Sequence, residues 1–154
     1  IDRAIVDFVG KEYNLSIGER TAEQVKMTIG SALMGGEEHM QLRGRNMRSG
    51  LPESIVVGQG EISYAIKNEI KEIVNAVRDT LAETPPELAG DIYATGITLT
   101  GGGACLEGIA ELISRETGMG VRVAEDPENC VVKGALMALD MGEDSGLCRE
   151  AVSA

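Results

Sequence analysis

Apolar residues recur every three or four positions over five stretches of the chain, and this spacing predicts five amphipathic helices. The longest stretch places eight apolar side chains on one helical face. Thr21, followed by Glu23 and Gln24, resembles an N-terminal capping arrangement near the start of the second stretch. The expected helices cover about residues 2–13, 18–32, 61–83, 106–117 and 129–139.

Shorter β-branched or alternating runs predict strands between these helices. Two of them, at 39–45 and 54–57, flank a turn-rich segment and form an expected strand pair. Two more, at 97–100 and 121–124, alternate with helices, so the second half predicts a β-α-β-α series. The Pro85-Pro86 pair ends the long helix. We expect the boundary between the first and second halves of the chain near residues 58–60.

Composition narrows the fold class further. The 154 residues are enough for one ordinary domain or two small lobes. The chain has no Trp, one Phe and three Tyr, so its core must be built from aliphatic side chains. This favours an α/β arrangement of helices on a sheet over a β-sandwich.

The charge balance argues against nucleic acid as a partner. The chain has 14 basic and 25 acidic residues and a formal charge of −11, which repels phosphate backbones at long range. One basic island, with arginines at 43, 45 and 48, stands against this trend. It is interpreted as a solvated surface or a contact between subunits.

No familiar catalytic or metal site emerges from the reactive residues. The three cysteines, Cys105, Cys130 and Cys148, are widely separated, which indicates neither a disulfide framework nor a zinc site. The single histidine, His39, has no partners at ligand spacing. Asp126 precedes the last expected helix, where capping is favoured over catalysis.

The apolar runs and the first residues of the chain indicate where the protein is located and whether the chain is whole. No apolar run approaches the roughly 20 residues needed to cross a bilayer, and no signal-peptide profile is visible, so we expect a soluble chain in a reducing cytoplasm. The chain starts at Ile1, without methionine and directly in a helical pattern. We expect it to be a piece of a longer protein.

The strongest candidate for a ligand site is the triple glycine at 101–103, which follows an apolar strand and precedes a helical pattern from Leu106. Residues without Cβ let a flat or anionic ligand lie against bare main chain, and a helix N-terminus favours negative charge. The spacing matches neither G-x-G-x-x-G nor a phosphate loop with its lysine. A tight strand-to-helix turn remains the structural alternative.

A second candidate lies on the second expected helix. Glu23 and Lys26 stand at i and i+3, so they share a face and offer an acceptor and a donor to a ribose hydroxyl or a purine. A solvent-exposed ion pair explains the same spacing.

Seven segments, in order and without large gaps, resemble the MreB/Mbl family of bacterial actin-like cell-shape proteins. They are YNLSIGERTAEQVK (13–26), IGSA (29–32), RGR (43–45), GLP (50–52), TPPELA (84–89), LTGGGA (99–104) and AEDP (124–127). The resemblance runs from Ile1 to about residue 140.

The resemblance implies an α/β actin-like ATPase fold, of the ribonuclease H-like, actin and Hsp70 superfold. This chain would be a partial second domain. Residues 1–60 would form a small α+β outer subdomain, and residues 61–128 the inner subdomain with the adenosine loop. Residues 129–154 would be a helix returning toward the first domain, with a tail.

The resemblance also implies roles for individual residues. Glu23 and Lys26 would line an adenosine pocket on one side, and Gly101, Gly102, Gly103 and Ala104 would form the adenosine loop on the other. The cofactor would be ATP, with Mg²⁺ in the full-length protein. The family's phosphate hairpins and water-positioning acid would precede Ile1, so this piece would hold no catalytic residue and no metal, and would not hydrolyse ATP alone.

The expected role is that of a filament-forming protein that sets rod cell shape by organising cell-wall elongation. Its partners would be other filament subunits, a RodZ-like membrane adaptor and the elongation machinery. It would lie at the inner face of the cell membrane when polymerised, with membrane contact only through regions outside this chain. Two alternatives are a stand-alone interaction module and a piece of an Hsp70-type chaperone or sugar kinase.

Overall fold

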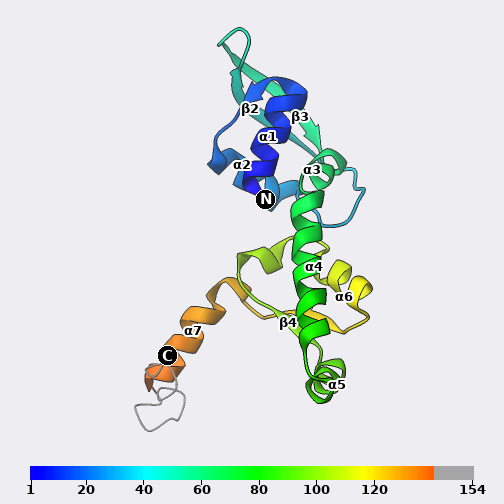
Figure 1. Ribbon diagram of the computed structural model, residues 1–154. Coiled ribbons are helices and arrows are strands. Elements are labelled where there is room, and N and C mark those ends of the chain that lie inside the picture. Colours follow the sequence, from blue (N-terminus) through cyan, green and yellow to red (C-terminus); the bar gives the residue numbers. More distant parts are fainter. Residues whose placement is uncertain (141–154) are drawn as a thin grey trace.

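The computed structural model describes residues 1–140, which form seven α-helices, five strands and two 3₁₀ turns (Figure 1). In chain order they are α1 (Asp2–Tyr13), β1 (Leu15–Ser16), α2 (Glu19–Ile29), β2 (His39–Asn46), β3 (Pro52–Gly58), α3 (Gln59–Ala65), α4 (Lys67–Glu83), α5 (Pro86–Thr95), β4 (Ile97–Leu99), η1 (Gly102–Cys105), α6 (Ile109–Thr117), β5 (Val121–Val123), η2 (Pro127–Asn129) and α7 (Cys130–Asp140). The expected tail, with Cys148, lies outside the described residues.

The first part of the chain packs helices on an antiparallel sheet. The strand order is β1-β2-β3, with Leu42 opposite Ile55 in the β2–β3 pair. The expected strand pair is therefore confirmed. α2 ends at Ile29, three residues before its predicted end, because Ser31 leaves the helix and pairs with Glu107. The predicted cap at Thr21 is wrong, since α2 starts at Glu19 without a side-chain cap.

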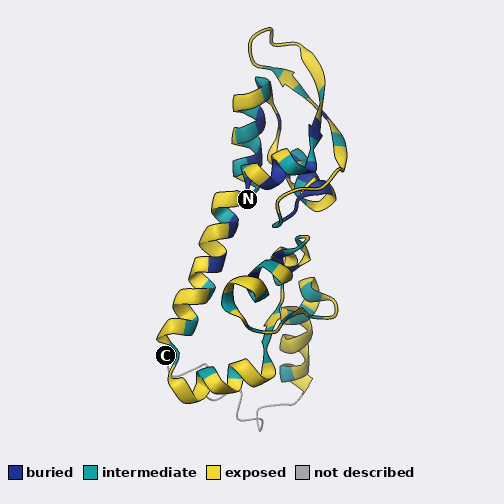
Figure 2. Ribbon diagram, turned by 90° about the vertical axis from the view of Figure 1, so that its right-hand side faces the viewer, coloured by how far each residue is buried: buried dark blue, intermediate teal, exposed yellow. Residues whose placement is uncertain are grey.

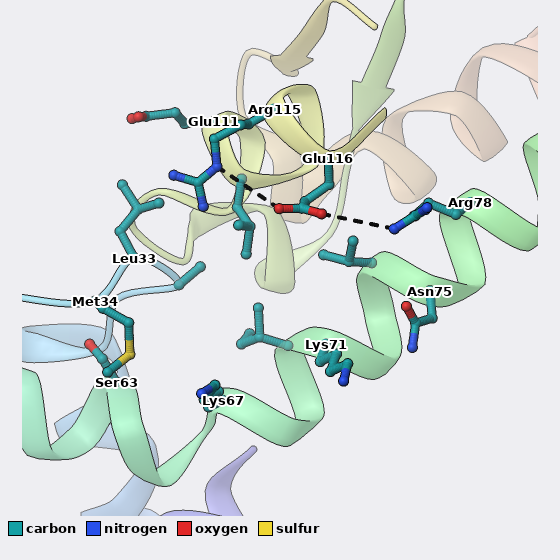
Figure 3. Close-up of a pocket in the computed structure, with 14 residues that line it drawn as sticks. Leu33, Met34, Ser63, Lys67, Lys71, Asn75, Arg78, Glu111, Arg115 and Glu116 are labelled. Atoms are coloured by element: carbon teal, nitrogen blue, oxygen red, sulfur yellow. Dashed lines mark ion pairs between the residues drawn. The ribbon is translucent and has the colours of Figure 1, made fainter. Parts of the chain in front are cut away.

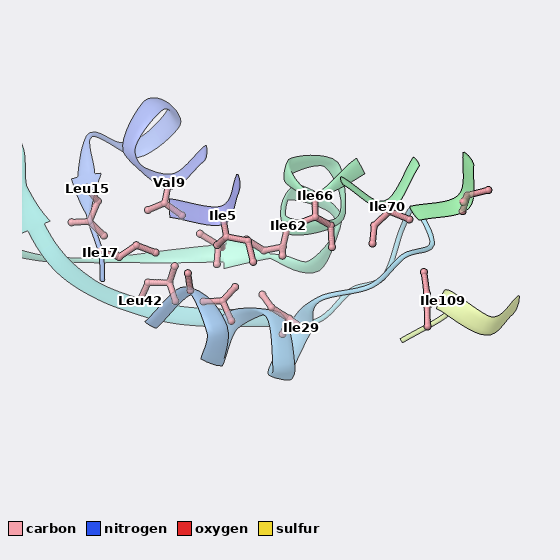
Figure 4. Packing of buried hydrophobic residues seen from close by; sticks show 14 of the residues in the cluster. Ile5, Val9, Leu15, Ile17, Ile29, Leu42, Ile62, Ile66, Ile70 and Ile109 are labelled. Carbon is pink, nitrogen blue, oxygen red and sulfur yellow. The ribbon is translucent and has the colours of Figure 1, made fainter. Parts of the chain in front are cut away.

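The hydrophobic core lies mainly between these helices and this sheet, and it continues along α4 to α6 (Figures 2 and 4). All of its members are aliphatic, as the composition predicts. The buried cluster comprises Ile5, Val9, Leu15, Ile17, Ala22, Val25, Ile29, Leu42, Val57, Ile62, Ile66, Ile70, Val74, Ile109 and Ile113.

The long helix predicted over 61–83 is interrupted at Ile66, which separates α3 from α4. Ile66 has φ −95° and ψ 2°, outside helical geometry. The bonds Ile66 N–H to Ile62 C=O and Ile70 N–H to Ile66 C=O both remain. The apolar face therefore continues across the break, which is why hydrophobic spacing alone did not reveal it.

The second part contains the predicted β-α-β-α series. β4 and β5 are parallel, with Ile97 opposite Val121, and α6 connects them. α4 packs against α6 and spans the distance between the two parts of the chain (Figure 1). The helix α5 was not predicted. α4 ends at Glu83, and Pro86 is the first residue of α5, a position that tolerates proline because its N–H would have no partner within the helix.

α7 projects from the remainder of the second part with its apolar side chains exposed (Figures 1 and 2). Val131, Val132, Leu136, Met137 and Leu139 are between 58 and 77% exposed. An isolated apolar helix face of this size is typical of a surface that contacts another protein segment. No helix in residues 1–140 has the length and apolar character needed to span a bilayer.

The Tyr13 hydroxyl joins the end of α1 to the start of α3 by donating a hydrogen bond to Glu61, whose other oxygen accepts from the Gly58 N–H. This bond to the carboxylate, helped by partial burial, raises the pKa of Tyr13 to about 12. A raised tyrosine pKa stabilises the fold below the unfolded-state pKa of about 10, and this stabilisation is lost as the pH rises toward 12.

We therefore expect Tyr13→Phe to lower the free energy of unfolding by less than about 1 kcal/mol at neutral pH. The difference from the unaltered chain should shrink as the pH rises above 10. Urea unfolding of both proteins, followed by circular dichroism across this pH range, measures it. A difference that is constant with pH would contradict the Tyr13–Glu61 bond.

Candidate functional site

α2 presents Glu23 and Lys26 beside the start of α1. Its buried residues Ala22, Val25 and Ile29 face the core, which leaves Glu23 exposed and Lys26 half-buried. The Lys26 Nζ atom lies 2.9 Å from Asp2 Oδ1 and 3.2 Å from Asp2 Oδ2. Lys26 therefore forms its ion pair with Asp2 of α1, and not with Glu23 on its own helix.

Glu23 lines a cavity of about 640 Å³ at this position. The cavity is bounded by Ile1, Asp2, Arg3, Glu19, Arg20 and Glu23. Its lining mixes acidic and basic side chains with the first residues of the chain, and it includes none of the glycines at 101–103.

The glycine loop follows β4 but does not lead directly into an α-helix. Gly101 has φ 79°, a left-handed conformation that favours glycine, and its N–H donates to the Pro127 carbonyl at 2.7 Å. Residues Gly102–Cys105 then form the 3₁₀ turn η1, and α6 starts only at Ile109. The prediction of a helix from Leu106 is therefore wrong by three residues, because Gly108 at φ 72° interrupts the helical conformation.

Gly102 and Gly103 are exposed, and their own fold does not require glycine at either position. A Cβ on Gly102 would come no closer than 3.8 Å to Glu128 Oε1, and a Cβ on Gly103 would meet nothing within 4 Å. Neither residue has a positive φ. The loop thus presents bare main chain to its surroundings, whereas Ala104 beside it is buried.

A short bridge connects the end of α2 to the end of η1. Ser31 pairs in parallel with Glu107, and the Ala32 N–H donates to the Glu107 carbonyl at 2.8 Å. The Glu107 side chain also accepts a bond from Gln59 Nε2 at 2.6 Å. These contacts join the segment that follows α2 to the segment that follows η1.

Glu23 and Lys26 lie within α2, whereas the bridge follows the end of this helix. With a rise of 1.5 Å per residue, Glu23 is on the order of 10 Å from Ser31 along the helix axis.

The loop after β5 supports the other side of the glycine loop. Asp126, at φ 56°, pairs with Lys133 at 2.6 Å and accepts a hydrogen bond from Asn129 Nδ2 at 2.8 Å. The bond from Lys133 lowers the pKa of Asp126 below its usual value, and Asn129 adds to this effect. The prediction that the Asp126 side chain caps backbone N–H groups is wrong. Its carboxylate makes no capping hydrogen bond and is instead bound by the side chains of Asn129 and Lys133.

Sequence reasoning missed the cavity between α4 and α6, also about 640 Å³. Polar residues recur at four-residue spacing along one face of α3 and α4, at 63, 67, 71 and 75, beside the apolar positions 70 and 74. This row of polar residues beside apolar ones was the feature of the sequence that could have indicated the cavity. Among residues 1–140, no cluster of three or more His, Cys, Asp or Glu side chains is arranged to hold a metal ion.

Comparison with known proteins gives a consistent picture. The family described as MreB/Mbl protein matches residues 1–145. The chain is 45% identical over 141 residues to the cell shape-determining protein MreB of Escherichia coli strain K12, covering 91% of this chain and 41% of that protein. It is 41% identical over 140 residues to the cell shape-determining protein Mbl of Bacillus subtilis strain 168, covering 90% of this chain and 42% of that protein.

Solved structures agree with the sequence relatives. MreB5 of Spiroplasma citri bound to ADP matches with a TM-score of 0.86 at 38% identity, over 91% of this chain and 43% of that one. The MamK double helical filament matches with a TM-score of 0.73 at 19% identity, over 90% of this chain and 43% of that one, which shows a shared fold. The chain therefore spans about two fifths of the length of the relatives it matches.

Proposed function

The chain belongs to the MreB/Mbl family, and from this premise we propose that it forms part of an ATP-binding, filament-forming bacterial actin homologue that sets rod cell shape by organising cell-wall elongation. Its fold is that of the actin-like filament proteins, and its named relatives are cell shape-determining proteins. ATP hydrolysis is assigned to a full-length protein and not to these residues, which supply one part of the nucleotide site.

In this proposal, Glu23 and Lys26 recognise the ribose or base from α2, and Gly101, Gly102, Gly103 and Ala104 support the nucleotide from the loop after β4. The observation that carries this proposal is the exposed main chain at Gly102 and Gly103. The fold would accept a side chain at either position, so it does not itself require glycine there. MreB5, which matches 91% of this chain, has been solved with ADP and with AMPPNP. Mg²⁺ would accompany ATP in the complete site.

The division into an outer subdomain (1–60), an inner subdomain (61–128) and a returning C-terminal helix (from 129) belongs to the same proposal. The sheet β1-β2-β3 with its helices would be the outer unit, and β4-β5 with α6 the inner one. The exposed apolar side chains of α7 support a helix that is covered by a further part of the protein.

Self-association is the second function that a specific observation favours. The MamK relative was solved as a double helical filament. Here Arg43 and Arg45 are exposed on β2, in a hairpin that projects from the first part of the chain (Figure 1). They are candidates for contacts between acidic subunits.

The proposal also includes partners other than further subunits. These are a RodZ-like membrane adaptor and the cell-wall elongation machinery, with the polymerised protein lying at the inner face of the cell membrane.

Valine at Gly103 tests the nucleotide site. We expect Gly103→Val to weaken ATP binding at least about tenfold, which is 1.4 kcal/mol, because its side chain occupies the surface offered to the ligand. The stability should stay within about 0.5 kcal/mol, because the Cβ meets no atom within 4 Å. Amide chemical shifts of the 154-residue chain titrated with Mg-ATP measure the affinity, and urea unfolding measures the stability.

Gly10→Val is the matched control, since a Cβ there also meets nothing within 4 Å and Gly10 lies in α1. It should bind ATP as the unaltered chain does. Joint shifts at 23–26 and 101–104 in the unaltered chain support a preformed half-site. Equal affinity of Gly103→Val and the unaltered chain would refute the role of the loop.

A further inference from the structure

The cavity between α4 and α6 combines a polar wall with an apolar floor (Figure 3). Its volume of about 640 Å³ is in the range of sites that hold small molecules. It is separate from the glycine loop: none of residues 101–104 lines it.

One wall carries an unpartnered hydroxyl and two cations in a row. Ser63 is only 3% exposed, and its Oγ atom has no hydrogen-bond partner in the described structure. Lys67 and Lys71 follow at four-residue intervals on the same helical face. Within residues 1–140, neither lysine forms an ion pair. A buried hydroxyl without a partner costs free energy, which a ligand oxygen would recover.

The wall of the cavity formed by α6 is already largely neutralised. Arg78 and Arg115 both approach the carboxylate of Glu116, at 3.9 and 4.0 Å (Figure 3). Glu111 adds a second acidic side chain on α6. The unmatched positive charge of the cavity therefore lies on the α4 wall, at Lys67 and Lys71, in a chain whose formal charge is −11.

The floor beneath these cations is apolar. Ile70 and Val74 of α4 are buried, and Leu112 of α6 is partly buried against the same core. An alkyl or aryl group lying between the two helices would be removed from water, at about 25 cal/mol per Å² of apolar surface. The arrangement places an anion site beside an apolar channel.

We propose that this cavity binds a small amphiphilic anion, with its carboxylate or phosphate head at Ser63, Lys67 and Lys71 and its apolar body over Ile70, Val74 and Leu112. The head neutralises the two lysines and offers an acceptor to the Ser63 hydroxyl. The affinity falls with added salt, because the two lysines are exposed.

Decanoate, at concentrations below micelle formation, is the probe for the test. Titrated into the ¹⁵N-labelled 154-residue chain, it should shift the amides of α4 and α6 around Lys67, Ile70 and Leu112. Decyl phosphate should do the same. Decanol, which lacks the charge, and inorganic phosphate, which lacks the chain, should each bind at least fivefold more weakly. Equal binding of decanol, or shifts confined to α7, would overturn the proposal.

Variants separate the two parts of the head site. Lys67→Gln/Lys71→Gln should weaken decanoate binding at least fivefold, whereas Arg43→Gln/Arg45→Gln, which removes two exposed cations from β2, should not change it. Ser63→Ala should weaken binding about twofold or more while leaving the urea midpoint equal or higher, because it removes an unsatisfied hydroxyl. Unchanged binding by the double lysine variant would refute the site.

Discussion

Replacing Ile62 by alanine is expected to lower the free energy of unfolding by about 3 kcal/mol. Ile62 is fully buried in α3 and belongs to the core cluster that also includes residues of α1, α2 and α4. Truncation removes three methyl or methylene groups and leaves a cavity, because helices that pack from several directions cannot collapse into it. Urea unfolding followed by circular dichroism measures this loss, since the chain has no tryptophan to report by fluorescence.

Ile73→Ala is the matched control on the neighbouring helix. Ile73 is 41% exposed on α4, and alanine has the higher helix propensity. We expect a loss below about 1 kcal/mol for this variant. Equal losses at the two positions would mean that α3 does not hold the core together in the way its burial indicates.

Gly108→Ala is expected to destabilise the chain by about 3 kcal/mol, from two causes that add. Gly108 has φ 72°, where a Cβ costs about 1 to 2 kcal/mol. The added Cβ would also lie 2.5 Å from Leu33 Cγ, so Leu33 or α6 must move. The shift would strain the hydrogen bond from the Ala32 N–H to the carbonyl of Glu107, the residue before Gly108.

Gly118→Ala isolates the backbone part of this effect. Gly118 ends α6 at φ 70°, but a Cβ there meets nothing within 4 Å. It should cost only about 1 kcal/mol. Adding Leu33→Ala to Gly108→Ala should relieve the clash, so the two changes should not add in a double-mutant cycle. If Gly108→Ala is no more harmful than Gly118→Ala, the Leu33 contact is unimportant.

The elements were largely predictable because their signals are local. The helix Asp2–Tyr13 and the strands around the 48–52 turn follow from apolar spacing and turn residues within a few positions. The parallel pairing of β4 and β5 follows from alternation of strand and helix. The interruption at Ile66 was not predictable this way, because the apolar spacing passes through it unchanged.

The candidate nucleotide site was only partly predictable. The open loop at Gly102 and Gly103 could be anticipated from three residues in a row without side chains. The partner of Lys26 could not, because Asp2 lies 24 residues away and meets it only when α1 packs on α2. The bridge from Ser31 to Glu107 joins positions 76 apart in the chain by the same kind of packing.

The sequence by itself thus determined the family, the order of helices and strands, the aliphatic core and the glycine loop, since each depends on residue type and on neighbours along the chain. Only the tertiary structure decided which charged side chains meet, where α6 begins, and that Ser63, Lys67, Lys71 and Leu112 line one cavity. The physical reason is that ion pairs and cavities depend on distances in space, which packing sets between segments that are far apart in sequence.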